Sequence, residues 1–77
     1  MMETFRMITY VIHIAGTIYV SDPYPTREAC EKDWRPFVVK IQQTQPGMEF
    51  VSRCGPSTDV QTLYERGQRI VVWRPDT

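Results

Sequence analysis

The stretch TREACEKDWRPFVVKI, residues 26–41, decides the fold. Its apolar side chains recur at the spacing of an α-helix and form a single stripe: Cys30, Trp34, Phe37, Val38 and Ile41. Thr26 is a good N-cap residue, and acidic residues follow in the first turn, where they favour the helix dipole. Pro36 lies away from the stripe, so we expect it to bend the helix without interrupting the apolar face. The pattern predicts one long amphipathic helix that ends by residues 45–47.

Two β-strands are predicted before this helix. Residues 4–14 are rich in β-branched and aromatic side chains, and residues 17–21 resume the pattern after Ala15-Gly16. A three-residue loop with Gly16 left-handed pairs Ile12 with Ile18. That register gathers one apolar face: Ile8, Tyr10, Ile12, Ile18 and Val20. A two-residue loop would divide the set between faces, so we expect the longer one. The opposite face, which includes Met7 and Tyr19, is either covered by a second layer or available to a partner.

Three further elements are predicted after the long helix. Residues 48–54 alternate like a strand, with Cys54 on the same side as Met48 and Phe50, until Gly55-Pro56 breaks it. Residues 57–67 predict a short helix with Ser57 as its cap, Gly67 as its stop, and an inward side made of Val60, Leu63 and Tyr64. Residues 69–75 predict the last strand.

The order ββαβαβ predicts an α+β fold. We expect a small, mainly antiparallel sheet, with the long helix and the short helix both packed on one face. A chain of 77 residues makes one compact domain, residues 1–77, with a modest core.

Composition disfavours several classes of function. Nine basic and nine acidic residues cancel, whereas a nucleic-acid-binding protein usually carries a net positive charge. The most apolar run, residues 7–20, is too short to span a bilayer and has no charged leader before it. We therefore expect a cytoplasmic protein with no membrane contact, for which nucleic acid is a less favoured partner than protein.

The two cysteines are the residues closest to chemistry. Cys30 falls on the helix stripe and Cys54 on the inner side of its strand, so the two can meet between helix and sheet. They are either buried free thiols or a disulfide that closes a loop of roughly 25 residues and contributes about 3 kcal/mol. A catalytic thiol is less favoured, because acidic neighbours raise the pKa of Cys30 and His13 lies on the other face. Two cysteines and one histidine without ligand spacing predict no metal site.

Candidate partner-binding residues are aromatic side chains and arginines. The C-terminal part interleaves them, and the hairpin and the proline-rich loop add two tyrosines: Tyr19, Tyr24, Arg53, Tyr64, Arg66, Arg69, Trp73 and Arg74. Arginine beside aromatic rings is typical of protein-interface hot spots, of phosphate and base contacts, and of guarded edge strands. With zero net charge we rank protein contact above nucleic acid, and we include a homodimer among the expectations.

No nucleotide-binding, hydrolase or metal motif occurs, so we expect no enzyme and no cofactor. In its small size, compact α+β plan and aromatic and charged surface, the chain resembles small phage proteins of the anti-CRISPR class. That resemblance implies an inhibitor or adaptor that blocks an RNA-guided effector complex in the cytoplasm of a bacterial host. The motifs TREAC and CGP give a second likeness, to short envelope-associated proteins, which implies a disulfide between Cys30 and Cys54. A nucleic-acid-binding phage protein that uses the C-terminal arginines and Trp73 is the remaining alternative.

Overall fold

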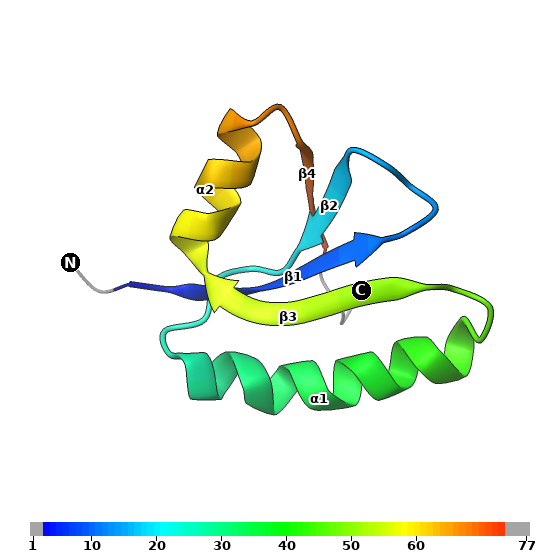
Figure 1. The fold of residues 1–77 in the computed structure, drawn as a ribbon. Helices are drawn as coiled ribbons and strands as arrows, with labels where there is room; N and C mark the ends of the chain where they lie inside the picture. The colour runs from blue at the N-terminus through cyan, green and yellow to red at the C-terminus, as the bar shows by residue number, and fades with distance from the viewer. Residues whose placement is uncertain (1–2, 74–77) are drawn as a thin grey trace.

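The computed structural model describes residues 3–73, which form a four-stranded mixed sheet and two helices (Figure 1). In chain order the elements are β1 (Phe5–Val11), β2 (Thr17–Val20), α1 (Arg27–Thr44), β3 (Phe50–Pro56), α2 (Ser57–Glu65) and β4 (Arg69–Val72). The α+β class, the order ββαβαβ, and the presence of one long and one short helix are thus confirmed.

The strands lie side by side in the order β3-β1-β2-β4. β1 runs antiparallel to both of its neighbours, whereas β4 pairs parallel with β2. β3 and β4 therefore point the same way at opposite edges, and the connection between them must cross two strands. Such a crossover between parallel strands usually contains a helix, and here that helix is α2.

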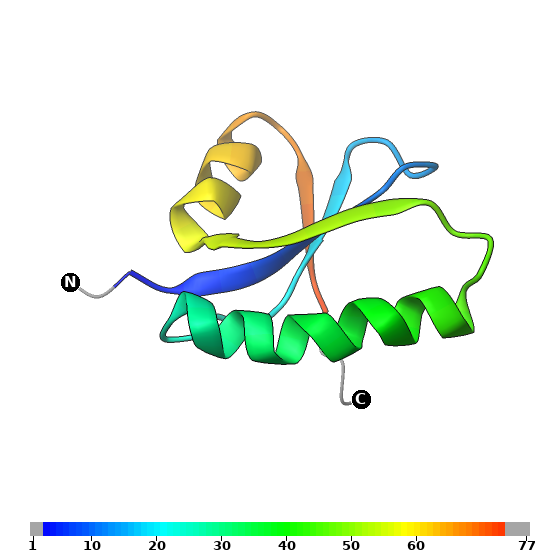
Figure 2. The same ribbon diagram turned by 60° about the horizontal axis from the view of Figure 1, so that its bottom comes forward.

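The prediction that both helices pack on one face is wrong: they cover opposite faces (Figures 1 and 2). α1 packs on the face that carries Met7 and Cys54, and α2 packs on the face that carries Ile8, Ile18 and Val20. The physical reason is the long crossover, since α1 already occupies one face over β3 and β1 and leaves α2 the other. The second layer that covers the Met7 face is therefore part of this chain.

The β1–β2 hairpin has a longer loop than predicted. Tyr10 pairs with Ile18 and Ile8 pairs with Val20, so the loop comprises residues 12–16 and the expected pair of Ile12 with Ile18 does not form. Gly16 has a φ of 81° and occupies the left-handed region, as expected. Because the register differs by two residues, every strand side chain keeps its predicted face. Ile12 alone leaves the core, with 56% of its surface exposed.

α1 agrees closely with its sequence pattern. The Thr26 hydroxyl accepts a hydrogen bond from the Ala29 N–H at 3.1 Å, which confirms the N-cap. The five predicted stripe residues all face the sheet, with Cys30 and Phe37 buried. Pro36 is exposed and lies within the helix, which continues to Thr44.

The C-terminal part differs from prediction in several places. β3 begins at Phe50 and not at residue 48, and β4 ends at Val72, while residues 74–75 of the predicted last strand lie outside the described part. β3 runs on through Gly55-Pro56, because both residues pair with the start of β1. Ser57 does not cap α2, since its hydroxyl bonds instead to the Thr4 hydroxyl at 2.6 Å. Val60 and Leu63 pack on the sheet as predicted, but Tyr64 is 65% exposed. Gly67, with a φ of 87°, follows the helix as expected.

Candidate protein-binding surface

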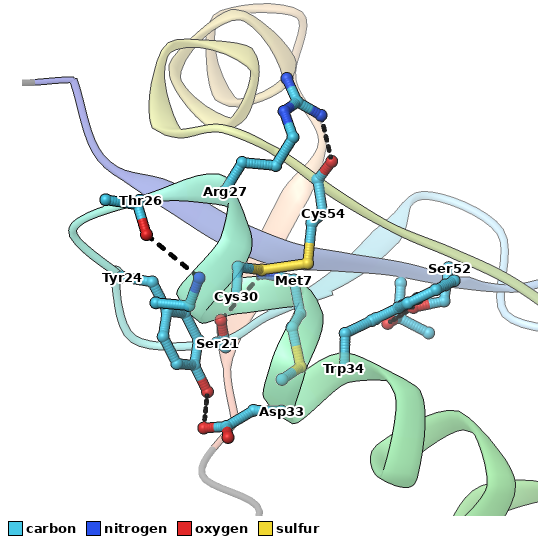
Figure 3. Close-up of a disulfide and its surroundings, with 12 residues drawn as sticks. Met7, Ser21, Tyr24, Thr26, Arg27, Cys30, Asp33, Trp34, Ser52 and Cys54 are labelled. Atoms are coloured by element: carbon cyan, nitrogen blue, oxygen red, sulfur yellow. Dashed lines mark hydrogen bonds between the residues drawn. A yellow bond between two sulfur atoms is a disulfide. The ribbon is translucent and has the colours of Figure 1, made fainter.

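Cys30 and Cys54 form a disulfide that joins the first turn of α1 to β3 (Figure 3). Their Cα atoms are 6.2 Å apart, and the Cys30 side chain is fully buried over Met7. Of the alternatives that the sequence left open, the structure shows the disulfide and not a pair of free thiols. Cys30 has no free thiol to act as a nucleophile, and His13 lies in the exposed hairpin loop.

Hydrogen bonds hold α1 to the sheet on both sides of this disulfide (Figure 3). Arg27 donates to the Cys54 carbonyl at 3.3 Å, and the Trp34 indole N–H donates to the Ser52 hydroxyl at 3.0 Å. Ser52 also bonds to Thr9 on β1 at 2.9 Å, so one polar chain connects α1, β3 and β1. These bonds anchor the N-terminal half of α1 to β3 and β1.

The other end of the molecule carries almost no charge. Residues 7–20 and residues 41–48 contain no Asp, Glu, Lys or Arg. The fold brings parts of these two segments together, because Ile14 lines the same hollow as Ile41 and Met48. Next to Met48, the Glu49 carbonyl accepts a hydrogen bond from the Ile12 N–H at 3.0 Å. Figure 1 shows the hairpin loop and the α1–β3 connection at the same end of the fold. We call the hairpin loop, residues 12–16, together with residues 41–48 the uncharged end.

An apolar cleft of about 230 Å³ opens at the uncharged end, on the side of α1 that faces β2. Side chains from both helix and sheet line it: Thr9, Val11, Ile14, Tyr19, Phe37, Ile41, Met48 and Trp73. The Phe37 and Trp73 rings contact each other in a tilted arrangement with centroids 4.6 Å apart. Aromatic pairs of this kind stabilise beyond their buried area, so Trp73 is held as one wall of the cleft.

A second hollow of about 580 Å³ lies on the other side of α1, against β3. Its walls include Ile12, Trp34, Val38 and Phe50, and Met48 lines both hollows. Methionine is flexible and polarisable, so it adapts readily to the shape of a bound group. The two hollows thus flank the C-terminal half of α1.

Among residues 3–73, the charged side chains nearest to the uncharged end stand at its margin. Lys40 precedes Ile41 on α1, Glu49 follows Met48, and Arg69 begins β4 with its N–H bonded to the Gly16 carbonyl at 2.8 Å. An apolar centre with a charged rim is the usual anatomy of a protein–protein interface.

The structure divides the predicted partner-binding residues among different surfaces. Tyr19 and Trp73 meet in the apolar cleft, and Arg69 stands at its margin. Tyr24 is tied into the fold, because its hydroxyl donates to Asp33 at 2.9 Å and its backbone bonds to Phe5.

The remaining candidates lie around α2. Arg53 forms an ion pair with Asp59 at 3.2 Å, and Arg66 lines the same small hollow. Tyr64 lines a separate hollow of about 470 Å³ next to Val72. Arg74 lies outside the described residues. Arg53 and Arg66 thus lie beside α2, whereas Arg69 begins β4 next to the hairpin loop.

Sequence reasoning missed the residues that complete the cleft: Ile14, Phe37, Ile41 and Met48. The sequence pattern assigned Phe37 and Ile41 to the core alone. In the structure they pack in the core and also line the cleft. The available signal was the absence of charge from residues 7–20 and residues 41–48. Those two segments meet only in the folded chain.

No protein-family model matches this chain, and no curated protein or solved structure is significantly similar to it. Residues 3–73 contain no cluster of His, Cys, Asp and Glu side chains that could hold a metal ion. Neither helix of this described part is both long enough and apolar enough to cross a membrane.

Proposed function

We propose that this protein is a small binding module that recognises another protein through its uncharged end. The observation that carries the proposal is the apolar cleft itself, with aromatic and methionine walls and no charged side chain among the described residues that line it. Interface cores are depleted in charged residues and enriched in Trp, Tyr, Phe and Met. The outer side of α1, by contrast, has the mixed charges of an ordinary solvated surface.

The scaffold beneath this surface favours binding by a preformed shape. The disulfide and the Trp34–Ser52–Thr9 chain fix α1 against the sheet, and Phe37 fixes Trp73. A surface that is already ordered loses less conformational entropy when a partner docks. A partner that inserts one apolar side chain beside Trp73 would bury it among Tyr19, Ile41 and Met48.

We further propose that binding is the whole activity, so that the protein acts as an inhibitor or adaptor by occupying its partner's surface. The resemblance to anti-CRISPR proteins suggests a subunit of an RNA-guided effector complex as that partner. Nucleic acid is less favoured, because the chain has no net positive charge and Arg53 is paired with Asp59.

Photocrosslinking from matched positions tests the docking surface. Ile14 on the cleft wall and Val39 on the outer side of α1 are 45% and 50% exposed, so benzoylphenylalanine replaces either one without burial. We expect Ile14→benzoylphenylalanine to yield a defined adduct in a bacterial lysate and Val39→benzoylphenylalanine to yield none. Mass spectrometry of the adduct identifies the partner, and Trp73→Ala should remove it.

Equal crosslinking from both positions would show non-specific contact and contradict the proposed surface. A nucleic-acid adduct at position 14 would contradict a protein partner and support the alternative of a nucleic-acid-binding protein. An adduct that includes an RNA-guided effector subunit would support the anti-CRISPR reading in particular.

The disulfide favours a second candidate, a protein of an oxidising compartment such as the bacterial envelope. Disulfides persist there, whereas cytosolic reductants keep most thiols reduced. Rapid alkylation of intact host cells, followed by mass analysis of the chain, distinguishes the two. An unmodified chain supports the envelope, and alkylation of both Cys30 and Cys54 supports the cytoplasm.

A further inference from the structure

The two edges of the sheet differ in how well they are protected from pairing with another strand. β3 forms one edge and β4 the other. In a strand, successive residues direct their N–H and C=O groups alternately to the two sides. The Ile12 N–H bonds to the Glu49 carbonyl, and the Ser57 N–H bonds to the Thr4 carbonyl. The odd-numbered residues of β3 therefore face β1, and the even-numbered ones face outward.

The outward side of β3 is partly blocked. The Cys54 carbonyl accepts a hydrogen bond from Arg27, and Pro56 has no N–H to donate. Both devices are typical of natural edge strands, which avoid unwanted pairing with charged side chains and proline.

The outward side of β4 has no such protection within the described residues. The N–H groups of Arg69 and Trp73 bond to carbonyls of Gly16 and Val20 at 2.8 and 2.7 Å, so these two residues face β2. By alternation, the backbone groups of Ile70 and Val72 point away from the sheet. Both residues are apolar, Val72 is 53% exposed, and β4 is an edge strand, so no strand of residues 3–73 lies on its outer side.

We propose that β4 pairs antiparallel with β4 of a second copy of this chain, around a two-fold axis at Val71. This register places Ile70 opposite the partner's Val72, and Val72 opposite the partner's Ile70. Each such pair can exchange two hydrogen bonds, so all four outward groups of Ile70 and Val72 are satisfied on both chains. The result is a continuous eight-stranded sheet with an isologous interface.

The side chains fit the same register. On the α2 face, the Ile70–Val72 pairs cover the exposed Val72 side chain and close the open side of the hollow beside Tyr64. On the α1 face, Val71 meets the partner's Val71, and Arg69 lies opposite the partner's Trp73. A guanidinium beside an indole ring is a favourable pair. Because this edge supplies both members of each pair, the occupant is a second copy and not an unrelated strand.

Cysteine crosslinking tests the register directly. The native cysteines are bonded to each other, so an introduced cysteine is the one free thiol. In the proposed dimer the two positions 71 form a non-hydrogen-bonded pair, with Cα atoms about 4.5 Å apart, which a disulfide can join. Val71→Cys should give a covalent dimer on mild oxidation. Val72→Cys, the matched control, should stay monomeric because its two copies lie about 7–8 Å apart on the diagonal.

A proline substitution tests the backbone bonds without relying on the crosslink. Val72→Pro removes the N–H group that points outward and leaves the hydrogen bonds between β4 and β2 in place. Val72→Thr keeps this N–H group. By light scattering, the wild type and Val72→Thr should move from the 9.1 kDa monomer toward twice that mass as concentration rises. Val72→Pro should remain a monomer with an unchanged circular dichroism spectrum.

Two outcomes would overturn the proposal. One is a wild-type chain that stays monomeric up to millimolar concentration, and the other is equal crosslinking of Val71→Cys and Val72→Cys. If the wild type is monomeric but Val72→Pro loses the adduct formed from position 14, the edge serves a partner's strand and not a second copy.

Discussion

Gly55 shows how a single residue couples two elements. It lies buried on β3, and a Cβ atom there would overlap the Arg53 guanidinium and lie 3.1 Å from the Ile8 Cδ1 atom. The missing side chain therefore leaves room for Arg53 to pass along the strand and reach Asp59 in the first turn of α2. Both charged groups are partly exposed, so the ion pair itself contributes little stability. The space beside Gly55 matters more for stability, because the core residue Ile8 also borders it.

We predict that Gly55→Ala lowers the free energy of unfolding by about 1–2 kcal/mol, because the added methyl group displaces Arg53 and presses on Ile8. Gly47→Ala is the matched control, since no atom lies within 4 Å of a Cβ there. Urea denaturation measures both. The double variant Arg53→Ala/Gly55→Ala should recover part of the loss. Equal stabilities of Gly55→Ala and Gly47→Ala would contradict this account.

At the scale of elements, local pattern was a good guide to α1 and a partial guide to the rest. The cap at Thr26 and the stripe of α1 depend on residues within a few turns of one another, so they could be read directly. The hairpin kept its predicted faces but not its loop length, because a shift of two residues leaves the alternation unchanged. β3 passed through Gly55-Pro56 because β1 pairs with both residues, and that contact is distant in sequence.

α2 and the candidate site were less predictable, because they too depend on contacts between residues far apart in sequence. Ser57 looked like a cap, but the Thr4 hydroxyl binds it instead. Tyr64 looked inward-facing, but α2 is short, and it packs Val60 and Leu63, both partly buried, against the sheet. In the candidate site, Tyr19 and Trp73 were predicted individually, whereas their meeting in one cleft depends on β4 lying beside β2.

The molecule as a whole has two small cores, one on each face of a single sheet. Among residues 3–73, the core beneath α1 contains four buried apolar residues, including both cysteines of the disulfide, and the other core contains three. A domain of this size rarely gains much stability from its core alone, so a covalent link is a large addition. The link spans 24 residues and includes the whole connection from α1 to β3.

We predict that Cys30→Ala/Cys54→Ala lowers the free energy of unfolding by about 3 kcal/mol, since the unfolded chain then regains the entropy that the closed loop had removed. Thermal unfolding followed by circular dichroism, with and without reductant, measures the effect. The reductant should destabilise the wild type and leave the double variant unchanged. A wild type that melts at the same temperature under both conditions would show that the disulfide is dispensable.

The sequence by itself determined the element order, the faces of β1 and β2, the long amphipathic helix and the inward direction of both cysteines, because these follow from spacing along the chain. Tertiary structure alone decided that the helices take opposite faces, that β4 joins parallel to β2, and that two uncharged segments meet beside Trp73. The physical reason is distance along the chain. Periodicity shows which side of an element is apolar, whereas the partner of that side is chosen by packing between residues far apart in sequence.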